Sequence, residues 1–203
     1  MRVLPCGADA VLVELDSAEQ VQAVHARLRA ADLPEVVELV PAARTVLIEV
    51  RPGSDGLAAV RELLGWVDPS EPPAIGREVV LPVVYDGPDL DLVARTAGLS
   101  TGEVVELHTG ALYTVAFCGF APGFGYLTGL PEPLRQPRLD SPRERVPAGS
   151  VGLAGEYTGA YPRSSPGGWR LIGRTTATLF DVDRDPPALL APGDRVRFAA
   201  QSR

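Results

Sequence analysis

A stretch of alternating glycine and aromatic residues, Gly119–Leu127 (GFAPGFGYL), is the first place where this sequence could build a binding site. Its glycines permit positive φ angles or close backbone approach, and Phe120, Phe124 and Tyr126 can wall an apolar pocket. We predict no helix directly after it, so it does not match the glycine-rich fingerprint of a dinucleotide-binding fold. Two interpretations are open: the wall of a ligand pocket, or a buried turn that plugs a β-barrel.

A second stretch, residues 137–152 (PRLDSPRERVPAGSVG), combines arginines with prolines. Arg138 and Arg143 each follow a proline, whose ring restricts the backbone, and their guanidinium groups can present paired donors to a carboxylate or phosphate. Ser150 stands at the start of a predicted strand, where a hydroxyl and backbone N–H groups can converge on an oxyanion. The alternative is that these arginines pair with neighbouring acidic residues in a surface network.

A third stretch, residues 161–175 (YPRSSPGGWRLIGRT), gathers hydroxyl side chains and arginines around a Ser-Pro-Gly-Gly turn. Ser165 exposes a hydroxyl in that turn, and Arg174 ends a predicted strand beside Thr175, an arrangement that can hold an anion. We expect Trp169 to belong to the core. The candidate substrate-binding residues of the chain are Arg138, Arg143, Ser150, Tyr161, Ser165, Arg174 and Thr175.

The composition excludes several kinds of chemistry. All 19 basic residues are arginine, so the chain offers neither a Schiff-base lysine nor the lysine of a phosphate-binding loop. It has only two histidines and two cysteines, without metal-ligand spacing, and we expect no metal site. No serine has an obvious histidine partner, so the sequence assigns no catalytic residue.

Charge and hydropathy limit the partners and the compartment. A net charge of −7 argues against nucleic-acid binding. Residues 131–175 nevertheless carry seven arginines against four acids, a local excess typical of a site for a small anion. The mean hydropathy is near zero and no apolar run reaches about 18 residues, so we expect no membrane span. The first residues lack the pattern of a signal peptide, which predicts a cytoplasmic protein.

The N-terminal third predicts a compact α+β unit. A helix begins at Ser17, where the spacing to the next glutamine fits a capping box. Three prolines within residues 68–73 can continue neither a helix nor a central strand, and we place a domain boundary there. The predicted domains are residues 1–73 and residues 77–203. Short β-rich runs predict strands at residues 10–15, 36–40 and 45–50.

The second domain predicts two short helices and a mainly β fold. Residues 78–85 predict a strand, in which Pro82 suggests either a position at a sheet edge or a bulge. Helices follow at residues 89–96 and from Ser100, and His108 near the end of the second helix would place a partial positive charge at its negative pole. Several strands with irregular connections indicate a closed or nearly closed barrel. These strands are predicted at residues 112–118, 149–156, 169–173, 177–182 and 195–199.

Four motifs of the second domain together resemble the allophanate hydrolase subunit 1 family, also called KipI-like, which includes the B subunit of 5-oxoprolinase. They are GFAPGFGYL, PRLDSPRERVPAGSVGLAG, TGAYPRSSPGGWRLIGRT, and LFD with the closing PGDRVRF, in family order. The resemblance covers nearly all of residues 77–203, whereas the first domain matches only in length and element pattern. It implies a small α+β N-terminal domain followed by a mainly β, cyclophilin-like barrel domain.

The resemblance also implies a function shared among several proteins. Family members act with a KipA-like subunit 2 and a third, lactam-utilisation-like protein as an ATP-dependent 5-oxoprolinase, which opens the lactam of 5-oxoproline to glutamate. We therefore expect a hydrolase subunit that is inactive alone. ATP is expected as a cofactor of the complex; because the chain has no nucleotide motif, its contact with ATP stays open.

Within such a complex, we hypothesise that the loops of residues 119–176 form half of a composite site. Arg143 and Arg174 would anchor anions. The residues that would orient the amide are Ser150, Ser165 and Thr175. The competing interpretation is a binding regulator that inhibits a sensor histidine kinase, as one branch of the family does. Prolyl isomerisation is disfavoured, because only fold analogy suggests it.

Overall fold

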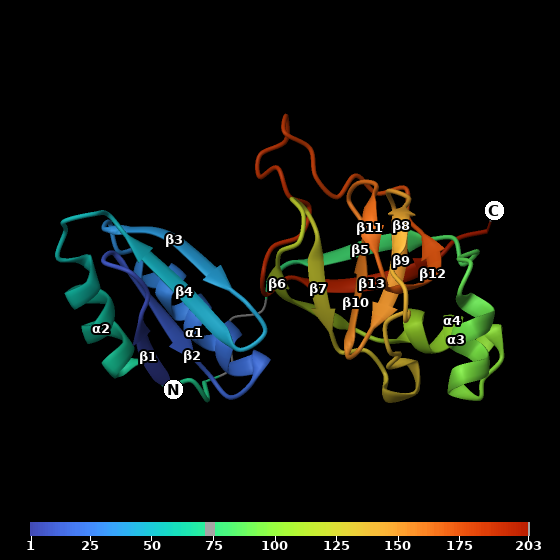
Figure 1. The fold of residues 1–203 in the computed structure, drawn as a ribbon, viewed down its shortest axis with the longest axis horizontal. Coiled ribbons are helices and arrows are strands. Elements are labelled where there is room, and N and C mark those ends of the chain that lie inside the picture. The colour runs from blue at the N-terminus through green and yellow to red at the C-terminus, as the bar shows by residue number, and fades with distance from the viewer. Residues whose placement is uncertain (72–75, 203) are drawn as a thin grey trace. The chain divides into compact units, whose positions relative to one another are not determined.

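The computed structural model describes residues 1–71 and 76–202, and the chain divides into two units, Met1–Ile75 and Gly76–Arg203 (Figure 1). The boundary predicted at residues 68–73 runs into residues 72–75, which lie outside the described part. Of the helices in the described ranges, none has the length and apolar character needed to cross a bilayer.

Unit 1 is an antiparallel sheet in the order β1-β2-β4-β3 with two helices. The buried alternate residues of β2 and β4 and the apolar face of α1 form its core. The three predicted strands and the helix predicted from Ser17 are confirmed. Strand β1 was not predicted, because it is short and largely exposed and ends in a proline. The elements are β1 (Arg2–Pro5), β2 (Ala10–Glu14), α1 (Ala18–Ala31), β3 (Val36–Pro41), β4 (Thr45–Val50) and α2 (Gly56–Trp66).

Helix α1 begins as its cap predicts. The Ser17 hydroxyl accepts a hydrogen bond from the Gln20 N–H. The Gln20 side chain accepts one at 3.0 Å from the N–H of Asp16, the residue before the cap, whereas a capping box would use the N–H of Ser17 itself. His25 lies on the buried face of this helix, and burial lowers its pKa to about 4. It is therefore a neutral core residue at neutral pH.

Unit 2 is a nearly closed barrel of seven strands in the order β12-β9-β10-β7-β6-β13-β5. A bridge between Val84 and Arg174 joins the two sheet edges through a pair of 2.9 Å backbone hydrogen bonds. A separate two-stranded sheet pairs β8 with β11. The elements are β5 (Glu78–Val83), α3 (Leu90–Ala97), α4 (Thr101–Gly110), β6 (Tyr113–Cys118), β7 (Gly125–Thr128), the 3-10 helix η1 (Glu132–Leu134), β8 (Arg143–Val146), β9 (Ser150–Ala154), β10 (Tyr157–Ala160), β11 (Ser165–Gly167), β12 (Arg170–Arg174) and β13 (Arg195–Ala200).

The inside of the barrel is filled by aliphatic and aromatic side chains, with one polar network among them. His108 of α4 contacts the Tyr85 hydroxyl through Nδ1 at 2.7 Å and the Thr158 hydroxyl through Nε2 at 3.0 Å. Complete burial lowers the pKa of His108 to about 3, so the ring is neutral. The prediction that it carries positive charge at the helix end was wrong, because the side chain points into the core.

Two other strand predictions had different outcomes. Pro82 lies on β5, which occupies a sheet edge and pairs in parallel with β13, so the edge position is confirmed. The strand predicted at residues 177–182 was wrong: this segment leaves the barrel and makes only an isolated bridge, Phe180 to Ala188. The apolar alternation there is strand-like, but the Val84–Arg174 bridge already closes the edge that it would need.

Candidate functional site

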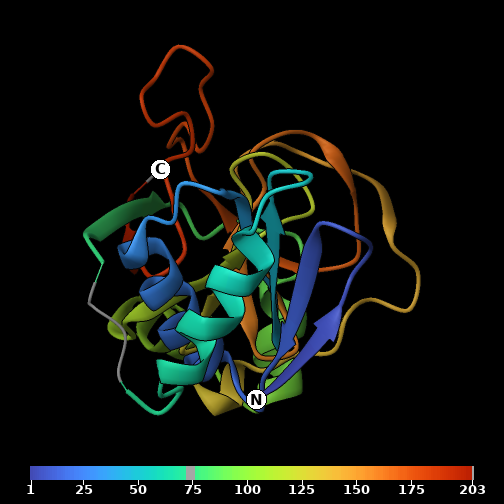
Figure 2. The same ribbon diagram turned by 90° about the vertical axis from the view of Figure 1, so that its left-hand side faces the viewer.

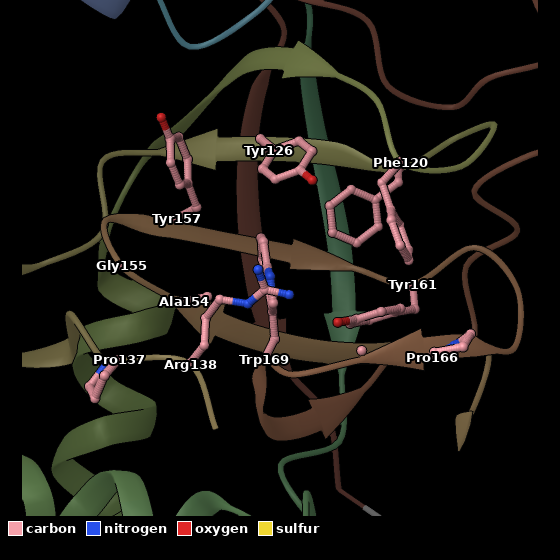
Figure 3. Close-up of a pocket in the computed structure, with 12 residues that line it drawn as sticks. Phe120, Tyr126, Pro137, Arg138, Ala154, Gly155, Tyr157, Tyr161, Pro166 and Trp169 are labelled. Carbon is pink, nitrogen blue, oxygen red and sulfur yellow. The ribbon is translucent and has the colours of Figure 1, made fainter. Parts of the chain in front are cut away.

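A pocket of about 420 Å³ lies on the outer face of the barrel (Figure 3). Along β7 and β9, Leu127 and Leu153 point into the barrel core, so their neighbours Tyr126 and Ala154 face outward. The pocket is therefore built on the barrel wall. Its lining residues are Phe120, Phe124, Tyr126, Pro137, Arg138, Ala154, Gly155, Tyr157, Tyr161, Pro166, Gly167 and Trp169.

The aromatic side chains of the pocket pack against one another edge to face. The Phe124 ring lies 5.0 Å from Tyr126 and 5.3 Å from both Tyr161 and Trp169, centroid to centroid. Gly159 lies beneath them, because a Cβ atom there would stand 3.3 Å from both Phe124 and Trp169. Such contacts fix the ring orientations and give the pocket a preformed apolar wall.

The upper rim of the pocket is a tight turn that carries Phe120. This residue has a φ of 67° and an exposed side chain, a conformation that costs a residue with a Cβ atom about 1–2 kcal/mol. Backbone hydrogen bonds hold the turn, among them Gly119 N–H to the Phe124 carbonyl at 3.2 Å. In this position the Phe120 ring packs edge to face against the Tyr161 ring, with 6.0 Å between the ring centroids.

Arg138 brings a positive charge to this apolar site. Figure 3 shows its guanidinium reaching over Trp169, toward the side of the pocket where Tyr126 and Tyr161 lie. Within residues 1–71 and 76–202, the Arg138 guanidinium has no hydrogen bond or ion pair, although its charge acts on the Tyr126 and Tyr161 hydroxyls. Its donors are therefore available to a ligand, and a guanidinium presents them in a planar fork that matches a carboxylate.

The tyrosine hydroxyls around Arg138 are neutral at physiological pH. Burial raises the pKa of Tyr126 and of Tyr161, and the charge of Arg138 offsets part of each shift. Burial, together with the nearby Glu156 carboxylate, raises the pKa of Tyr157 to about 12. The pocket thus offers aromatic faces, neutral hydroxyls and one guanidinium. This combination suits a small organic anion with an apolar body.

The other two candidate arginines lie outside the pocket, each with a carboxylate. Arg143 donates through Nη2 to both oxygens of Asp89, at 2.7 and 2.8 Å. Arg174 donates through Nε to Asp86 at 3.1 Å. Their predicted part as anion anchors stays a prediction, but a ligand would compete with these carboxylates.

The candidate hydroxyl residues are also dispersed. Ser150 is buried, and its carbonyl accepts from the Tyr161 N–H. The Thr175 hydroxyl accepts from the Ala177 N–H at 3.1 Å. The Ser165 hydroxyl is buried without a hydrogen-bond partner in the described part of the chain, next to the pocket-lining Pro166. Of the seven candidate substrate-binding residues, the structure brings Arg138 and Tyr161 together in the pocket.

Several pocket-lining residues were missed, and one of them, Tyr157, lies beside a local turn. Tyr157 follows a two-residue turn, Gly155–Glu156, that connects β9 to β10, with Ala154 paired to Tyr157. This glycine has a φ of 58°, and a Gly-containing two-residue loop between apolar runs is a hairpin signal that sequence reasoning could have used. Trp169 was predicted to be core; it is buried and lines the pocket as well.

The described residues hold no group of three or more histidine, cysteine, aspartate or glutamate side chains arranged to bind a metal ion. The pocket lining of aromatic rings around the Arg138 guanidinium suits the binding of an organic anion. Neither a nucleophile–base pair nor a carboxylate lines the pocket. A reaction at this site would need reactive groups from elsewhere.

Comparisons with known proteins find two relatives that carry the same name. The 5-oxoprolinase B subunit of Escherichia coli O157:H7 is 47% identical over 204 residues, covering 96% of this chain and 94% of its own length. The 5-oxoprolinase B subunit of Bacillus subtilis is 50% identical over 125 residues, covering 60% of this chain and 52% of its own length. The crystal structure of TTHA0988 superposes with a TM-score of 0.84 at 37% identity over 96% of this chain, which spans only 40% of that longer chain.

A family model named carboxyltransferase domain, subdomain C and D, matches residues 1–190. The match runs through both units and includes the pocket walls. Together with the near-full-length identity to the E. coli relative, it shows that the chain belongs to the family of carboxyltransferase domain, subdomain C and D proteins.

Proposed function

We propose that this chain is a subunit of a 5-oxoprolinase and that its aromatic pocket binds 5-oxoproline. The observation that carries the proposal is the Arg138 guanidinium, which has no partner among the described residues and lies in a pocket otherwise lined by rings, prolines and small residues. The names of the E. coli and B. subtilis relatives support the activity.

The chemistry of the substrate fits the pocket. 5-Oxoproline is a five-membered lactam with one carboxylate. Its methylene groups would lie against Phe124 and Trp169, and its carboxylate would take the paired donors of Arg138. The neutral Tyr126 and Tyr161 hydroxyls can exchange hydrogen bonds with the lactam N–H and carbonyl.

The proposed reaction needs more than this chain. A lactam is a stable amide, and the pocket lining supplies neither a nucleophile nor a general base. We propose that a KipA-like subunit 2 and a lactam-utilisation-like protein complete the site, in the cytoplasm. The pocket fits ATP poorly, because its lining contains one cation and no loop of the phosphate-binding kind. We therefore assign ATP binding to a partner.

The experiment reconstitutes the reaction. Glutamate release from 5-oxoproline and ATP is measured with the two partner proteins, with and without this chain. The chain is expected to be required. Arg138→Met should raise the KM for 5-oxoproline about tenfold or more, since a charge-assisted contact is lost. Arg135→Met is the matched control, because Arg135 is exposed nearby but outside the pocket.

Two results would overturn the proposal. Glutamate release that proceeds equally well without this chain would remove it from the enzyme. An Arg138→Met variant with the same KM as Arg135→Met would remove the substrate from this pocket.

A further inference from the structure

The segment that carries Arg138 runs from η1 to β8 and forms no helix or strand of its own, as the gold part of Figure 2 shows. A side chain on such a segment keeps one position only where the backbone on both sides of it is held. On one side, Gln136 forms an isolated bridge with Gly155, whose N–H donates to the Gln136 carbonyl at 2.6 Å. On the other side, the Leu139 N–H donates to the Gly168 carbonyl at 2.8 Å. The backbone of Arg138 is therefore fastened at two points.

The side chain of Gln136 is held as firmly as its backbone. Gln136 is only 2% exposed. Its side-chain oxygen accepts a hydrogen bond from Nη1 of Arg170 on β12, and the same Nη1 atom donates to the Thr96 hydroxyl of α3 at 3.0 Å. Neither Gln136 nor Arg170 lines the pocket. Gln136 thus connects the Arg138 segment to a barrel strand and, through that strand, to a helix.

Packing alone does not account for the contact between Gln136 and Arg170. Burying an amide and a guanidinium costs desolvation free energy that two apolar side chains would avoid. The Nε atom of Arg170 adds to this cost, because it is buried and has no hydrogen-bond partner among the described residues. A polar contact kept beside a binding pocket at such a cost favours a role in building the pocket.

The position of Gln136 decides where the Arg138 guanidinium goes. Pro137 stands between the two residues, and its ring restricts the backbone that joins them. The Arg138 side chain then passes Gly168, where a Cβ atom would stand 3.7 Å from Arg138 Nε, and reaches over Trp169 (Figure 3). The guanidinium has no hydrogen bond or ion pair within the described residues. Its direction is therefore set by the backbone rather than by a partner of its own.

We propose that Gln136 is a positioning residue for Arg138: held by Arg170, it fixes the backbone that directs the guanidinium into the pocket. This inference rests on the proposed function, in which Arg138 binds the carboxylate of the substrate. A carboxylate accepts two parallel N–H donors only where the planar fork meets it squarely. A small change in the direction of Arg138 therefore weakens binding although the charge is still present.

The test is a calorimetric titration of the full chain with 5-oxoproline. Gln136→Met keeps the length of the side chain and removes the oxygen that accepts from Arg170, so the Kd should rise about threefold or more. Gln136→Glu keeps an oxygen acceptor for Arg170 and should restore a Kd close to that of the wild type. Thr158→Val is the matched control, because it removes a buried hydroxyl that contacts His108 inside the barrel, and its Kd should be unchanged.

A second pair of variants separates positioning from a general loss of structure. Gln136→Met is combined with Arg138→Met, and the two substitutions together should give the same Kd as Arg138→Met alone, because the fork that Gln136 directs is then absent. A merely structural role of Gln136 would raise the Kd by the same factor in both backgrounds. Urea denaturation establishes that each variant is folded at the temperature of the titration.

The outcomes distinguish this inference from the proposed function. A Gln136→Met variant that binds like the wild type, or that weakens binding equally with and without Arg138, overturns the positioning role alone. Failure of the wild-type chain to bind 5-oxoproline, or an Arg138→Met variant that binds as tightly as the wild type, overturns both. Because the titration uses no partner protein, a complex that releases no glutamate counts against the proposed function only.

Discussion

Arg143 and Asp89 form an ion pair that ties β8 to the start of α3. The carboxylate of Asp89 accepts two short hydrogen bonds from Arg143 Nη2 and a third, at 2.7 Å, from the Leu171 N–H of β12. Arg143 also donates to the Trp169 carbonyl at 3.3 Å. One buried acid thus holds together a helix start, a barrel strand and the small sheet beside the pocket.

Loss of this pair should destabilise the protein. Asp89 is only 8% exposed, so Arg143→Met would leave a buried carboxylate without its counter-ion, at a cost of about 2–4 kcal/mol. The matched control is Arg174→Met. Arg174 is 57% exposed in its pair with Asp86, and we expect a cost of about 1 kcal/mol or less. Urea denaturation measures the free energy of unfolding of both variants, and equal losses would contradict the structural role of Asp89.

The KM of the folded Arg143→Met variant tests the predicted anion-anchor role of Arg143 separately.

When the protein unfolds in mild acid, the His108 side chain should bind a proton. Its pKa is about 3 in the folded chain and returns to its ordinary value of 6.5 on unfolding. Its contribution to stability is therefore complete above pH 6.5, and falls by about 1.4 kcal/mol per pH unit as the pH drops toward 3. An indicator dye measures proton uptake on urea unfolding at about pH 5. His108→Gln should take up about one proton fewer than the wild type.

His25 provides the matched case in the other unit. Its pKa is about 4 when folded, so His25→Gln should also lower the proton uptake by about one at the same pH. A His108→Gln variant that takes up as many protons as the wild type would show that the ring is charged in the folded barrel.

Gly167→Ala should close part of the pocket. The added Cβ would lie 2.5 Å from the Tyr161 hydroxyl oxygen, so the tyrosine ring must move into the pocket or away from Trp169. We expect the KM for 5-oxoproline to rise about tenfold in the reconstituted complex. Gly110→Ala is the control, because a Cβ there meets no atom within 4 Å. Unchanged kinetics in Gly167→Ala would argue that Tyr161 does not touch the substrate.

The two thiols should differ sharply in reactivity. Cys6 is exposed, whereas burial raises the pKa of Cys118 to about 11, with a further contribution from the Asp194 charge. The thiolate is the reactive form, so a thiol-specific chromogenic reagent at pH 8 should modify one cysteine quickly in the folded chain. Cys6→Ser should abolish that fast reaction, and urea should reveal the second thiol. A fast reaction that persists in Cys6→Ser would contradict the burial of Cys118.

Local sequence signals predicted the elements that depend on local chemistry. Ser17 and Ser100 start helices because their hydroxyls satisfy N–H groups within the same turn. The strands β7, β8, β10 and β11 were not predicted. Each is only three or four residues long, and all but β8 contain glycine. β8 pairs with β11, which comes only after two further strands of the chain, whereas β7 and β10 each pair across a turn with the strand before them, β6 and β9.

The site was predictable only in part for the same reason. Phe120 and Tyr126 stand in one continuous motif, so their common place at the pocket follows from local spacing. Pro166 reaches the pocket because β11 pairs with β8, a partnership that no local pattern encodes. The pairing of Arg143 with Asp89 spans 54 residues. Charge content alone could not distinguish it from Arg138, which has no hydrogen-bond or ion-pair partner among the described residues.

The position of the pocket on the barrel wall has an evolutionary consequence. The side chains that fill the barrel and those that line the pocket alternate along the same strands, facing opposite ways. A mutation at Tyr157 alters the ligand wall while leaving the backbone ladder and the interior packing in place. Substitutions on the outer face can therefore change the shape and polarity of the pocket while the interior packing that stabilises the barrel stays the same.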